Sequence, residues 1–396
     1  MIRKYGLTAA FLGASLLSMG QVDLINKVKD NGSDSSSAGY EFETVVDLET
    51  TDVRNQGRSG TCWSYATTSF LESELLRMGK EPIDLSEMFT VRQVYLDKAE
   101  KYVRLHGHLN FAQGGALPDV LYVIKKYGAV PQEVYEGLNY GTDINNHGEL
   151  EAILAAQVEA VIKNKNGEIT PNWREAFEAT LDAYLGAYPE QFTYKGKEYT
   201  PRSFADEYLE INPDDYVQLT SWTHHPMNEE AIIQVPDNWT WASSYNVPLN
   251  DMVEAVNHSL QKGYTVSWAT DVSEKGFSLK NGLAIVPAKA VKEMSAEERK
   301  KLFSEPIEEK EITPEVRQAA YNNYSTTDDH GMQITGMVKD QTGTVFYIVK
   351  NSWGERQNDK RPGYIYASEA FVRYKTIGVL MHKDALPKSL QKRFDL

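Results

Sequence analysis

The chain has almost no cysteine, since Cys62 is the only one among its 396 residues. A single thiol excludes an intramolecular disulfide framework. It also leaves the pairs His106 and His108, and His224 and His225, without the further ligands that a zinc site needs. The P-loop, HExxH and GxSxG patterns are missing as well. The sequence therefore predicts neither a metal site nor a cofactor.

Positive charge is scarce too. The chain carries 41 Lys and Arg against 56 Asp and Glu, which gives a net charge of −15. Nucleic acids and anionic membranes attract proteins through concentrated Lys and Arg, so no nucleic-acid partner is predicted. Because 41% of the residues are apolar, the chain is able to bury a full core in two or three modules.

Long apolar runs are missing except near the N-terminus. Residues 1–20 begin with Arg3 and Lys4, continue through an apolar stretch and end in small residues. This pattern is typical of a secretory signal peptide and is too short to span a membrane. We predict export, to the periplasm, with no membrane span after signal removal; the alternative is a buried N-terminal helix in a cytoplasmic protein. Residues 21–39 are predicted to form a flexible linker because their second half is rich in Ser, Gly, Asn and Asp.

Cys62 lies where a turn meets a helix. Residues 55–60 are rich in turn formers, and a helical repeat follows Cys62 at Thr67, Leu71, Leu75 and Met78. The sulfur is therefore expected on the first helical turn, where unpaired N–H groups and the helix dipole favour the thiolate. This placement predicts a nucleophile; the alternative is a small buried apolar residue.

Two alternating stretches near the C-terminal end supply partners for this thiol. Residues 332–338 and 345–349 have the period of strands, and the segment between them contains Gly343. His330 and Asn351 flank the predicted hairpin and are expected to lie opposite each other. Cysteine, histidine and asparagine then converge on one site.

These residues carry a family resemblance. Gln56, Cys62-Trp63, His330-Gly331 and Asn351-Ser352-Trp353-Gly354 occur in the order found in papain-like cysteine peptidases, which the chain resembles. His330 follows Cys62 by 268 residues, whereas papain and cathepsins have about 130–150 between the two. That longer interval is similar to the bacterial aminopeptidase C and bleomycin hydrolase group. Further motifs shared with this group are Leu85-Ser86-Glu87, Gln113-Gly114-Gly115, Lys126-Tyr127-Gly128, Asn246-Val247-Pro248 and Gly263-Tyr264-Thr265.

The resemblance implies an α+β, papain-like fold with a helical half and a β-rich half. We expect the helical half with the nucleophile at 40–138 and the β-rich half with His330 and Asn351 at 216–385. Residues 139–215 between them resemble the group's helical, hook-like insertion, which implies a homohexamer. Residues 386–396 are expected to form a short C-terminal arm.

The resemblance also assigns roles at the reaction centre. Cys62 is expected to attack the substrate carbonyl, His330 to transfer protons and Asn351 to orient the imidazole ring. The side chain of Gln56 and the backbone N–H of Cys62 would form the oxyanion hole. Trp63 and Trp353 are supporting residues, the latter a shield over the bond between histidine and asparagine.

Substrate contacts are expected at two further places. Gly114 and Gly115 would pair with the extended peptide as an added strand, and the alternative is an ordinary loop. In the resembled group the C-terminal carboxylate binds the free amine of the substrate, which assigns this role to Leu396. Only nine residues follow Pro387, and their full extension is about 30 Å. Asp271, after a predicted strand, is expected to cap a loop; the alternative is a carboxylate packed near the cleft.

The function that these assignments predict is a thiol aminopeptidase that removes N-terminal residues from peptides by a Cys-His-Asn, acyl-enzyme mechanism. One alternative is a papain-like endopeptidase or oligopeptidase. A second is a non-catalytic binding or scaffold protein that retains the fold. The presence of Gln56, Cys62, His330 and Asn351 together favours an enzyme.

Overall fold

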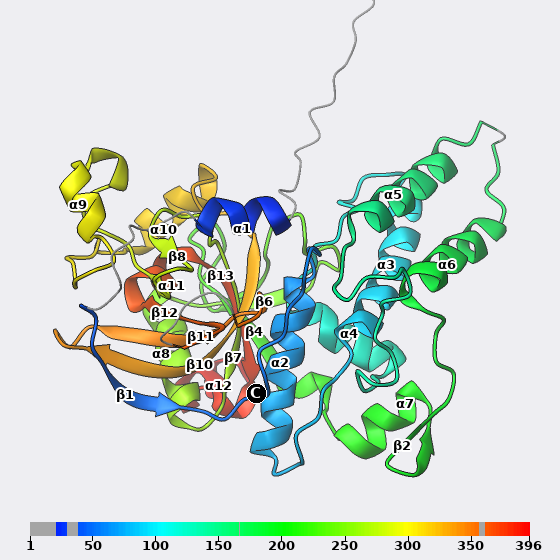
Figure 1. Ribbon diagram of the computed structural model, residues 1–396, viewed down its shortest axis with the longest axis horizontal. Coiled ribbons are helices and arrows are strands. Elements are labelled where there is room, and N and C mark those ends of the chain that lie inside the picture. Colours follow the sequence, from blue (N-terminus) through cyan, green and yellow to red (C-terminus); the bar gives the residue numbers. More distant parts are fainter. Residues whose placement is uncertain (1–20, 30–38, 166, 356–360) are drawn as a thin grey trace, which may run out of the picture.

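The computed structural model describes residues 21–29, 39–165, 167–355 and 361–396. Residues 1–20, which carry the predicted signal peptide, lie outside this part. Within it, no helix has both the length and the apolar character needed to cross a membrane. A helical half and a β-rich half lie side by side (Figure 1).

The helical half is built on three packed helices, α2 (Cys62–Arg77), α3 (Glu87–Arg104) and α4 (Pro118–Tyr127). The predicted helix after the turn is therefore confirmed, with Cys62 as its first residue. Gly79 at φ +78° follows the end of α2 in a conformation that favours glycine. Ser86 begins α3, because its side chain accepts the N–H of Phe89.

The predicted insertion is helical, as expected, with a small hairpin. Its apolar side chains Leu150, Leu154, Phe177 and Leu181 join the same buried cluster as those of α2 and α3. The insertion therefore extends the core of the helical half instead of forming one of its own, on the right of Figure 1. Its limits at 139 and 215 remain a prediction. Its elements are α5 (Gly148–Ile162), α6 (Asn172–Leu185), β2 (Phe192–Tyr194), β3 (Lys197–Tyr199), α7 (Pro201–Phe204), the π-helical η1 (Ala205–Leu209) and the 3-10 helix η2 (Pro213–Asp215).

The β-rich half contains one 11-stranded sheet within the described residues. The order is β5-β6-β4-β13-β7-β10-β11-β12-β9-β8, and β1 pairs with β10. The strands are β1 (Phe42–Asp47), β4 (Tyr216–Thr220), β5 (Glu229–Ile232), β6 (Ser243–Asn246), β7 (Val266–Thr270), β8 (Phe277–Ser278), β9 (Leu283–Ala284), β10 (His330–Asp340), β11 (Val345–Lys350), β12 (Tyr364–Ser368) and β13 (Thr376–His382). Helices of this half are α8 (Leu249–Gln261), η3 (Val291–Glu293), α9 (Ala296–Lys301), α10 (Pro314–Asn322), α11 (Glu369–Lys375) and η4 (Lys383–Ala385).

The hairpin predicted around residue 340 is confirmed as β10 and β11. Gln333 pairs with Lys350, and a bulge after Ile334 shifts the later pairs by one residue. Gly336 follows this bulge, and a Cβ there would lie 2.4 Å from the carbonyl oxygen of Val46 on β1. Only glycine allows the edge strand to come this close.

Polar side chains join the two halves between their apolar cores. Thr67 of α2 hydrogen-bonds Ser267 of β7 across 3.0 Å, and Ser69 donates to Gln333 of β10 at 2.7 Å. Gln333 also donates to Ser73 of α2 at 2.8 Å, which adds a third contact between α2 and the sheet. The first residues of α2 and β10 are thereby held in register.

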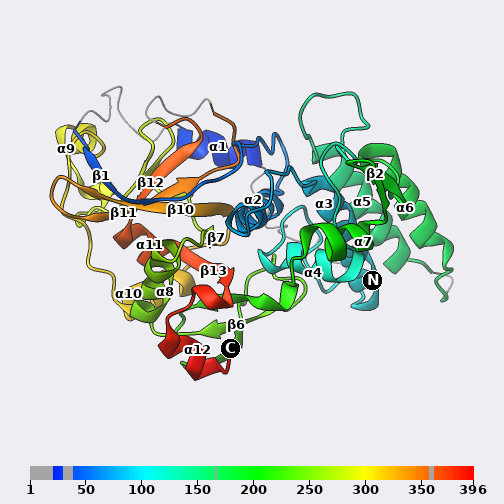
Figure 2. The same ribbon diagram turned by 90° about the horizontal axis from the view of Figure 1, so that it is seen from below.

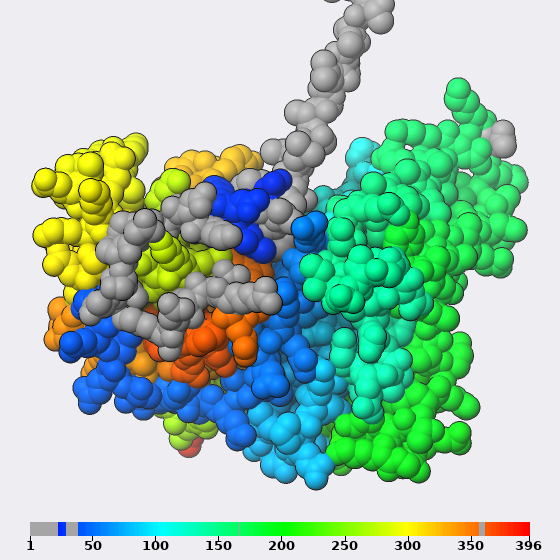
Figure 3. Space-filling model, in the orientation of Figure 1, coloured from blue at the N-terminus to red at the C-terminus, as the bar shows by residue number. Residues whose placement is uncertain are grey.

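Residues 21–29 correct the predicted linker. They form the helix α1 (Gln21–Lys29), in which Leu24 and Val28 are buried in the cluster that also contains Phe277. The linker prediction is wrong here because two apolar residues four apart give one helical face to bury. Figure 3 shows this segment in dark blue against the β-rich half. Residues 30–38 of the same prediction lie outside the described residues.

The C-terminal residues correct the expected arm, because 388–394 form the helix α12 (Lys388–Phe394). Leu390 is buried, and the Phe394 ring stacks on Tyr245 of β6 at 4.3 Å between centroids. Arg393 forms an ion pair with Asp251 of α8 at 2.6 Å. The segment is therefore packed along the β-rich half instead of extended.

Candidate active site

Cys62 is partly exposed and begins α2. Two hydrogen bonds tie the chain on either side of it to Gln113. The N–H of Gly60 donates to Gln113 Oε1 at 2.6 Å, and the indole N–H of Trp63 donates to the Gln113 carbonyl at 3.1 Å. Trp63 thus joins α2 to the segment that contains Gly114, and its supporting role stays a prediction.

His330 is the first residue of β10, and Asn351 directly follows β11. His330 Nε2 and Asn351 Oδ1 are 2.8 Å apart, so the predicted convergence of these two residues is confirmed. Nδ1 of the buried imidazole has no hydrogen-bond partner within the described residues. The ring stacks on Trp353 with 4.3 Å between centroids. One ring nitrogen is fixed while the other stays free for proton transfer.

Cys62 lies directly beside this histidine segment. A Cβ added to Gly331 would be 3.2 Å from the Cys62 carbonyl oxygen. The backbone of Gly331 also hydrogen-bonds to the thiol. The structure therefore brings Cys62, His330 and Asn351 together from three separate elements.

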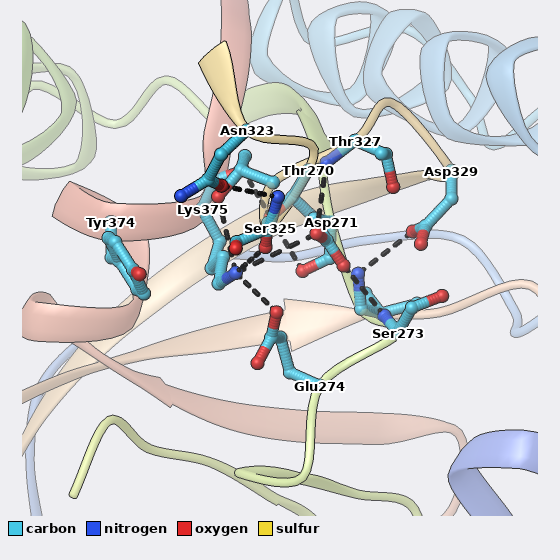
Figure 4. A network of polar contacts seen from close by, with 12 residues as sticks. Thr270, Asp271, Ser273, Glu274, Asn323, Ser325, Thr327, Asp329, Tyr374 and Lys375 are labelled. Atoms are coloured by element: carbon cyan, nitrogen blue, oxygen red, sulfur yellow. Dashed lines mark hydrogen bonds and ion pairs between the residues drawn. The ribbon is translucent and has the colours of Figure 1, made fainter. Parts of the chain in front are cut away.

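A polar network fixes the loop that leads into His330 (Figure 4). Asp271 accepts the N–H of Ser273 at 2.8 Å and that of Thr327 at 3.0 Å. The Lys375 ammonium group is 3.7 Å from Asp271, and Asp329 accepts the N–H of Val272 at 2.8 Å. Asp271 is therefore a loop cap, as predicted. Asp329 likewise accepts a backbone N–H, and the imidazole of His330 is hydrogen-bonded by Asn351 instead.

Gln56 is fully buried and is held from both sides of the cleft. Its Nε2 donates to the Ser59 carbonyl at 2.8 Å, and its Oε1 accepts from the Ser352 hydroxyl at 2.6 Å. The first bond uses one of the two amide protons, which leaves the second for a substrate oxygen. Ser352 was not predicted as a site residue, although it lies within the Asn-Ser-Trp-Gly motif.

Gly114 and Gly115 lie where larger residues do not fit. A Cβ on Gly115 would be 2.7 Å from the Trp63 ring, and one on Gly114 would be 2.0 Å from Asp237 Oδ2. The buried Lys98 ammonium donates to the carbonyls of Ala112, at 3.0 Å, and Gly114. The segment is thus rigidly held beside the nucleophile helix. Neither Lys98 nor Asp237 was predicted, because neither belongs to any of the motifs shared with the resembled group.

Burial disfavours an isolated charge on either reacting group. It raises the pKa of the Cys62 thiol to about 12, and the charges of Asp328, Asp237 and Asp329 act in the same direction. It lowers the pKa of His330 to about 4, although the bond to Asn351 acts the other way. Proton transfer from Sγ to Nδ1 creates both charges together, and their mutual attraction and the helix terminus offset part of this desolvation.

Leu396 does not lie beside Cys62, His330 and Asn351. Thr270 pairs with both His330 and Thr376, so this end of β13 lies near the site, whereas α12 follows His382 at the opposite end. Leu396 donates its backbone N–H to Gln391 of the same helix. Figure 2 shows the C-terminus beside α12, away from α2. The predicted contact of its carboxylate with the cleft is therefore absent from this structure.

A cavity of about 430 Å³ lies where the two halves meet. It is lined by residues 108–110 of the helical half and by residues of the loop between β5 and β6, including Val235, Trp239 and Trp241. Asn110 lines it and also donates to Asp237 at 2.9 Å. One wall of the cavity is therefore bonded to Asp237, the residue that contacts Gly114.

The comparisons with known proteins agree with this geometry. Cysteine proteinase 1, mitochondrial, of Saccharomyces cerevisiae is 24% identical over 94% of this chain and 82% of its own length. Aminopeptidase C of Streptococcus thermophilus is 24% identical over 89% of this chain and 84% of its own. The crystal structure of PepW from Lactobacillus rhamnosis superposes with a TM-score of 0.68, at 18% identity, over 95% of this chain and 87% of that one.

The predicted α+β, papain-like cysteine peptidase fold is therefore confirmed, as is the resemblance to the aminopeptidase C group. The sequence model of the Peptidase C1-like family matches residues 102–396, which is well over half of the chain. The site, the fold and this match together show that the chain belongs to the Peptidase C1-like family of cysteine peptidases.

Proposed function

We propose that this protein is a thiol aminopeptidase that removes N-terminal residues from peptides. The observation that carries the proposal is the bond between His330 and Asn351 beside Cys62, with the second imidazole nitrogen free. The relatives named aminopeptidase C and aminopeptidase G support release of the N-terminal residue over internal cleavage.

The first half-reaction forms a thioester. His330 Nδ1 takes the thiol proton of Cys62, and the sulfur attacks the carbonyl carbon of the first residue. Negative charge collects on the carbonyl oxygen, where the free amide proton of Gln56 and the backbone N–H of Cys62 stabilise it. The carbon–nitrogen bond then breaks as His330 returns the proton to the leaving amine, which departs as the shortened peptide.

The second half-reaction hydrolyses the thioester. His330 takes a proton from water, the oxygen attacks the acyl carbon, and the sulfur leaves and regains the proton. The products are the free N-terminal amino acid and the restored thiol. Asn351 keeps Nε2 engaged through both steps, so that only Nδ1 exchanges protons.

An endopeptidase is the second candidate, since Leu396 lies away from the cleft. The test is cleavage of matched peptide amides with free and acetylated N-termini by the wild type and Cys62→Ser, under thiol reductant. We expect Cys62-dependent cleavage with a strong preference for the free amine. Equal cleavage of both peptides would establish an endopeptidase, and no Cys62-dependent cleavage would establish the scaffold alternative.

Two further proposals concern assembly and location. The helical insertion supports a homohexamer of the 44.7 kDa chain, and light scattering that gives a monomer mass would contradict it.

The pattern of residues 1–20 supports export to the periplasm. Cell fractionation with N-terminal sequencing tests this, and an uncleaved protein in the cytoplasm would overturn it.

A further inference from the structure

Asp237 places a carboxylate against the segment expected to bind the peptide. It lies in the loop between β5 and β6, so it comes from the half opposite to Gly114. A Cβ on Gly114 would be 2.0 Å from Asp237 Oδ2 and 2.6 Å from Oδ1. Both carboxylate oxygens therefore contact the glycine directly. An extended peptide along residues 114 and 115 has to pass this charge.

The carboxylate is only partly satisfied. Oδ1 accepts a hydrogen bond from Asn110 Nδ2 at 2.9 Å. Oδ2 has no hydrogen-bond or ion-pair partner within the part of the chain that the structure describes. Asp237 is half-buried, so that one oxygen is fixed and the other is open to a ligand.

A positive charge lies near Asp237 without neutralising it. The Lys98 ammonium donates to the backbone carbonyls of Ala112 and Gly114 and not to this carboxylate. Burial raises the pKa of Asp237, whereas Lys98 and the bond from Asn110 lower it. A second cation that reaches Oδ2 would therefore replace solvent at a poorly hydrated carboxylate, where a charge-assisted hydrogen bond is strong.

Asp237 is also close to the reaction centre. It contacts Gly114, and a Cβ on the next residue, Gly115, would lie 2.7 Å from the ring of Trp63, which follows Cys62 in α2. Its charge acts on the Cys62 thiol as well. The distance along a peptide between its terminal nitrogen and its first or second carbonyl is only a few ångströms. The terminal ammonium group of a substrate is thus the cation that fits between Gly114 and Cys62. Leu396, the expected partner of this group, packs elsewhere.

We propose that Asp237 binds the free N-terminal ammonium group of the peptide and thereby makes the enzyme an aminopeptidase. This inference rests on the proposed function and names the residue responsible for its specificity. Asp237 acts through Oδ2, while Asn110 holds Oδ1 and Lys98 holds the adjoining Gly114 carbonyl.

The test is the ratio of kcat/KM for a peptide amide with a free amine to that for its acetylated form. Asp237→Asn keeps the shape and the oxygen that accepts from Asn110 but removes the charge. We expect this ratio to fall about 10- to 100-fold, as for loss of a hydrogen bond to a charged group. Asp237→Ser removes the carboxylate and places a smaller side chain in the same space, and it should give the same loss. Thermal unfolding and titration of Cys62 with an alkylating probe establish that each variant is folded.

Two matched controls locate the effect. Asp328→Asn removes another carboxylate whose charge acts on Cys62 but which does not contact Gly114. Deletion of residues 395 and 396 removes the C-terminal carboxylate from its present position. Both are expected to keep the wild-type ratio.

The outcomes separate the two proposals. A wild-type preference for the free amine that survives in both Asp237 variants overturns this inference and leaves the aminopeptidase intact. Loss of the preference in the Asp328 variant or on removal of residues 395 and 396, and not in the Asp237 variants, overturns it as well. A wild type without any preference contradicts the aminopeptidase itself, and this inference with it.

Discussion

The two sides of the cleft are constructed differently. The loop at 55–62 is held by short side-chain hydrogen bonds. For example, Ser59 Oγ donates to the Gln56 carbonyl at 2.8 Å and lies 2.6 Å from Thr61 Oγ1, with which it forms a second hydrogen bond. The opposite side is held by backbone pairing, because β10 bonds to β7, β11 and β1. In the proposed mechanism the first side supplies the attacking atom and the oxyanion donors, and the second supplies the base. A change on the loop side should therefore affect rate first, and one on the strand side should affect rate and stability together.

The largest expected effect is that of Cys62→Ser. Removing the nucleophile of a triad enzyme costs on the order of 10⁶-fold in kcat, and the variant should keep the wild-type unfolding temperature because serine fills nearly the same volume. Turnover of a free-amine peptide and a thermal melt measure both. A variant with unchanged turnover would remove Cys62 from the mechanism.

Gln56→Ala is the next test of the loop side. Loss of one oxyanion donor lowers kcat about 10²- to 10³-fold, and the Ser59 carbonyl left without its partner lowers the free energy of unfolding by about 1–3 kcal/mol. Ser352→Ala is the control, because it removes only the hydroxyl that donates to Gln56 Oε1. It should cost far less rate. Near-normal turnover in Gln56→Ala would show that the oxyanion is stabilised by other groups.

Asn351→Ala tests the strand side and should have a smaller effect on rate. The bond to a protonated imidazole is worth about 1.5–3 kcal/mol, so kcat/KM should fall about 10- to 100-fold and the melting temperature should fall too. Asn351→Asp keeps an acceptor at the same position and should recover most of the rate. If Asn351→Ala were slower than Gln56→Ala, the strand side would contribute more to the rate than the loop side, contrary to our expectation.

The smallest expected effect concerns His147, a buried histidine whose ring, unlike that of His330, has no hydrogen-bond partner within the described residues. Burial lowers the pKa of His147, beside the start of α5, to about 4, as it does for His330. An unfolded imidazole titrates near 6.5, so the folded state binds fewer protons below that pH. The stability that follows from this difference is complete above about pH 6.5 and is lost as the pH falls toward 4.

His147→Phe should therefore weaken the acid destabilisation of the protein. The loss of unfolding free energy between pH 7 and pH 5 should shrink by about 2 kcal/mol, with turnover at pH 7 unchanged. Urea unfolding of wild type and variant at the two pH values measures it. An identical pH dependence in both would mean that His147 does not set this part of the stability.

The sequence predicted the elements whose signals are local. The repeat from Thr67 to Leu75 gave α2, and alternation around residue 340 gave β10 and β11 with His330 and Asn351 at one end. The apolar pattern at 232–235 continues to Val235, but β5 ends at Ile232, because the N–H of Val235 donates back to the Ile233 carbonyl before Pro236. Local patterns fix the type of an element better than its end.

Contacts between segments that are distant in the chain could not be predicted from the sequence. Asp237 lies in a turn directly after Pro236, and only the assembled halves place it on Gly114. Lys98 belongs to the helical repeat of α3, yet its ammonium group lies under the 112–114 backbone. The packing of α12 against β6 and α8, which removes Leu396 from the site, likewise depends on the tertiary structure and not on the length of the segment.

The solitary thiol has a further consequence under oxidising conditions. Cys62 is partly exposed, and no second cysteine occurs in the sequence to capture an oxidised sulfur as an internal disulfide. A sulfenic acid formed there is returned to the thiol only by an external thiol, and it otherwise proceeds to the irreversible sulfinic acid. Peroxide should therefore inactivate the enzyme in a single step that glutathione protects against and that mass spectrometry locates at one residue.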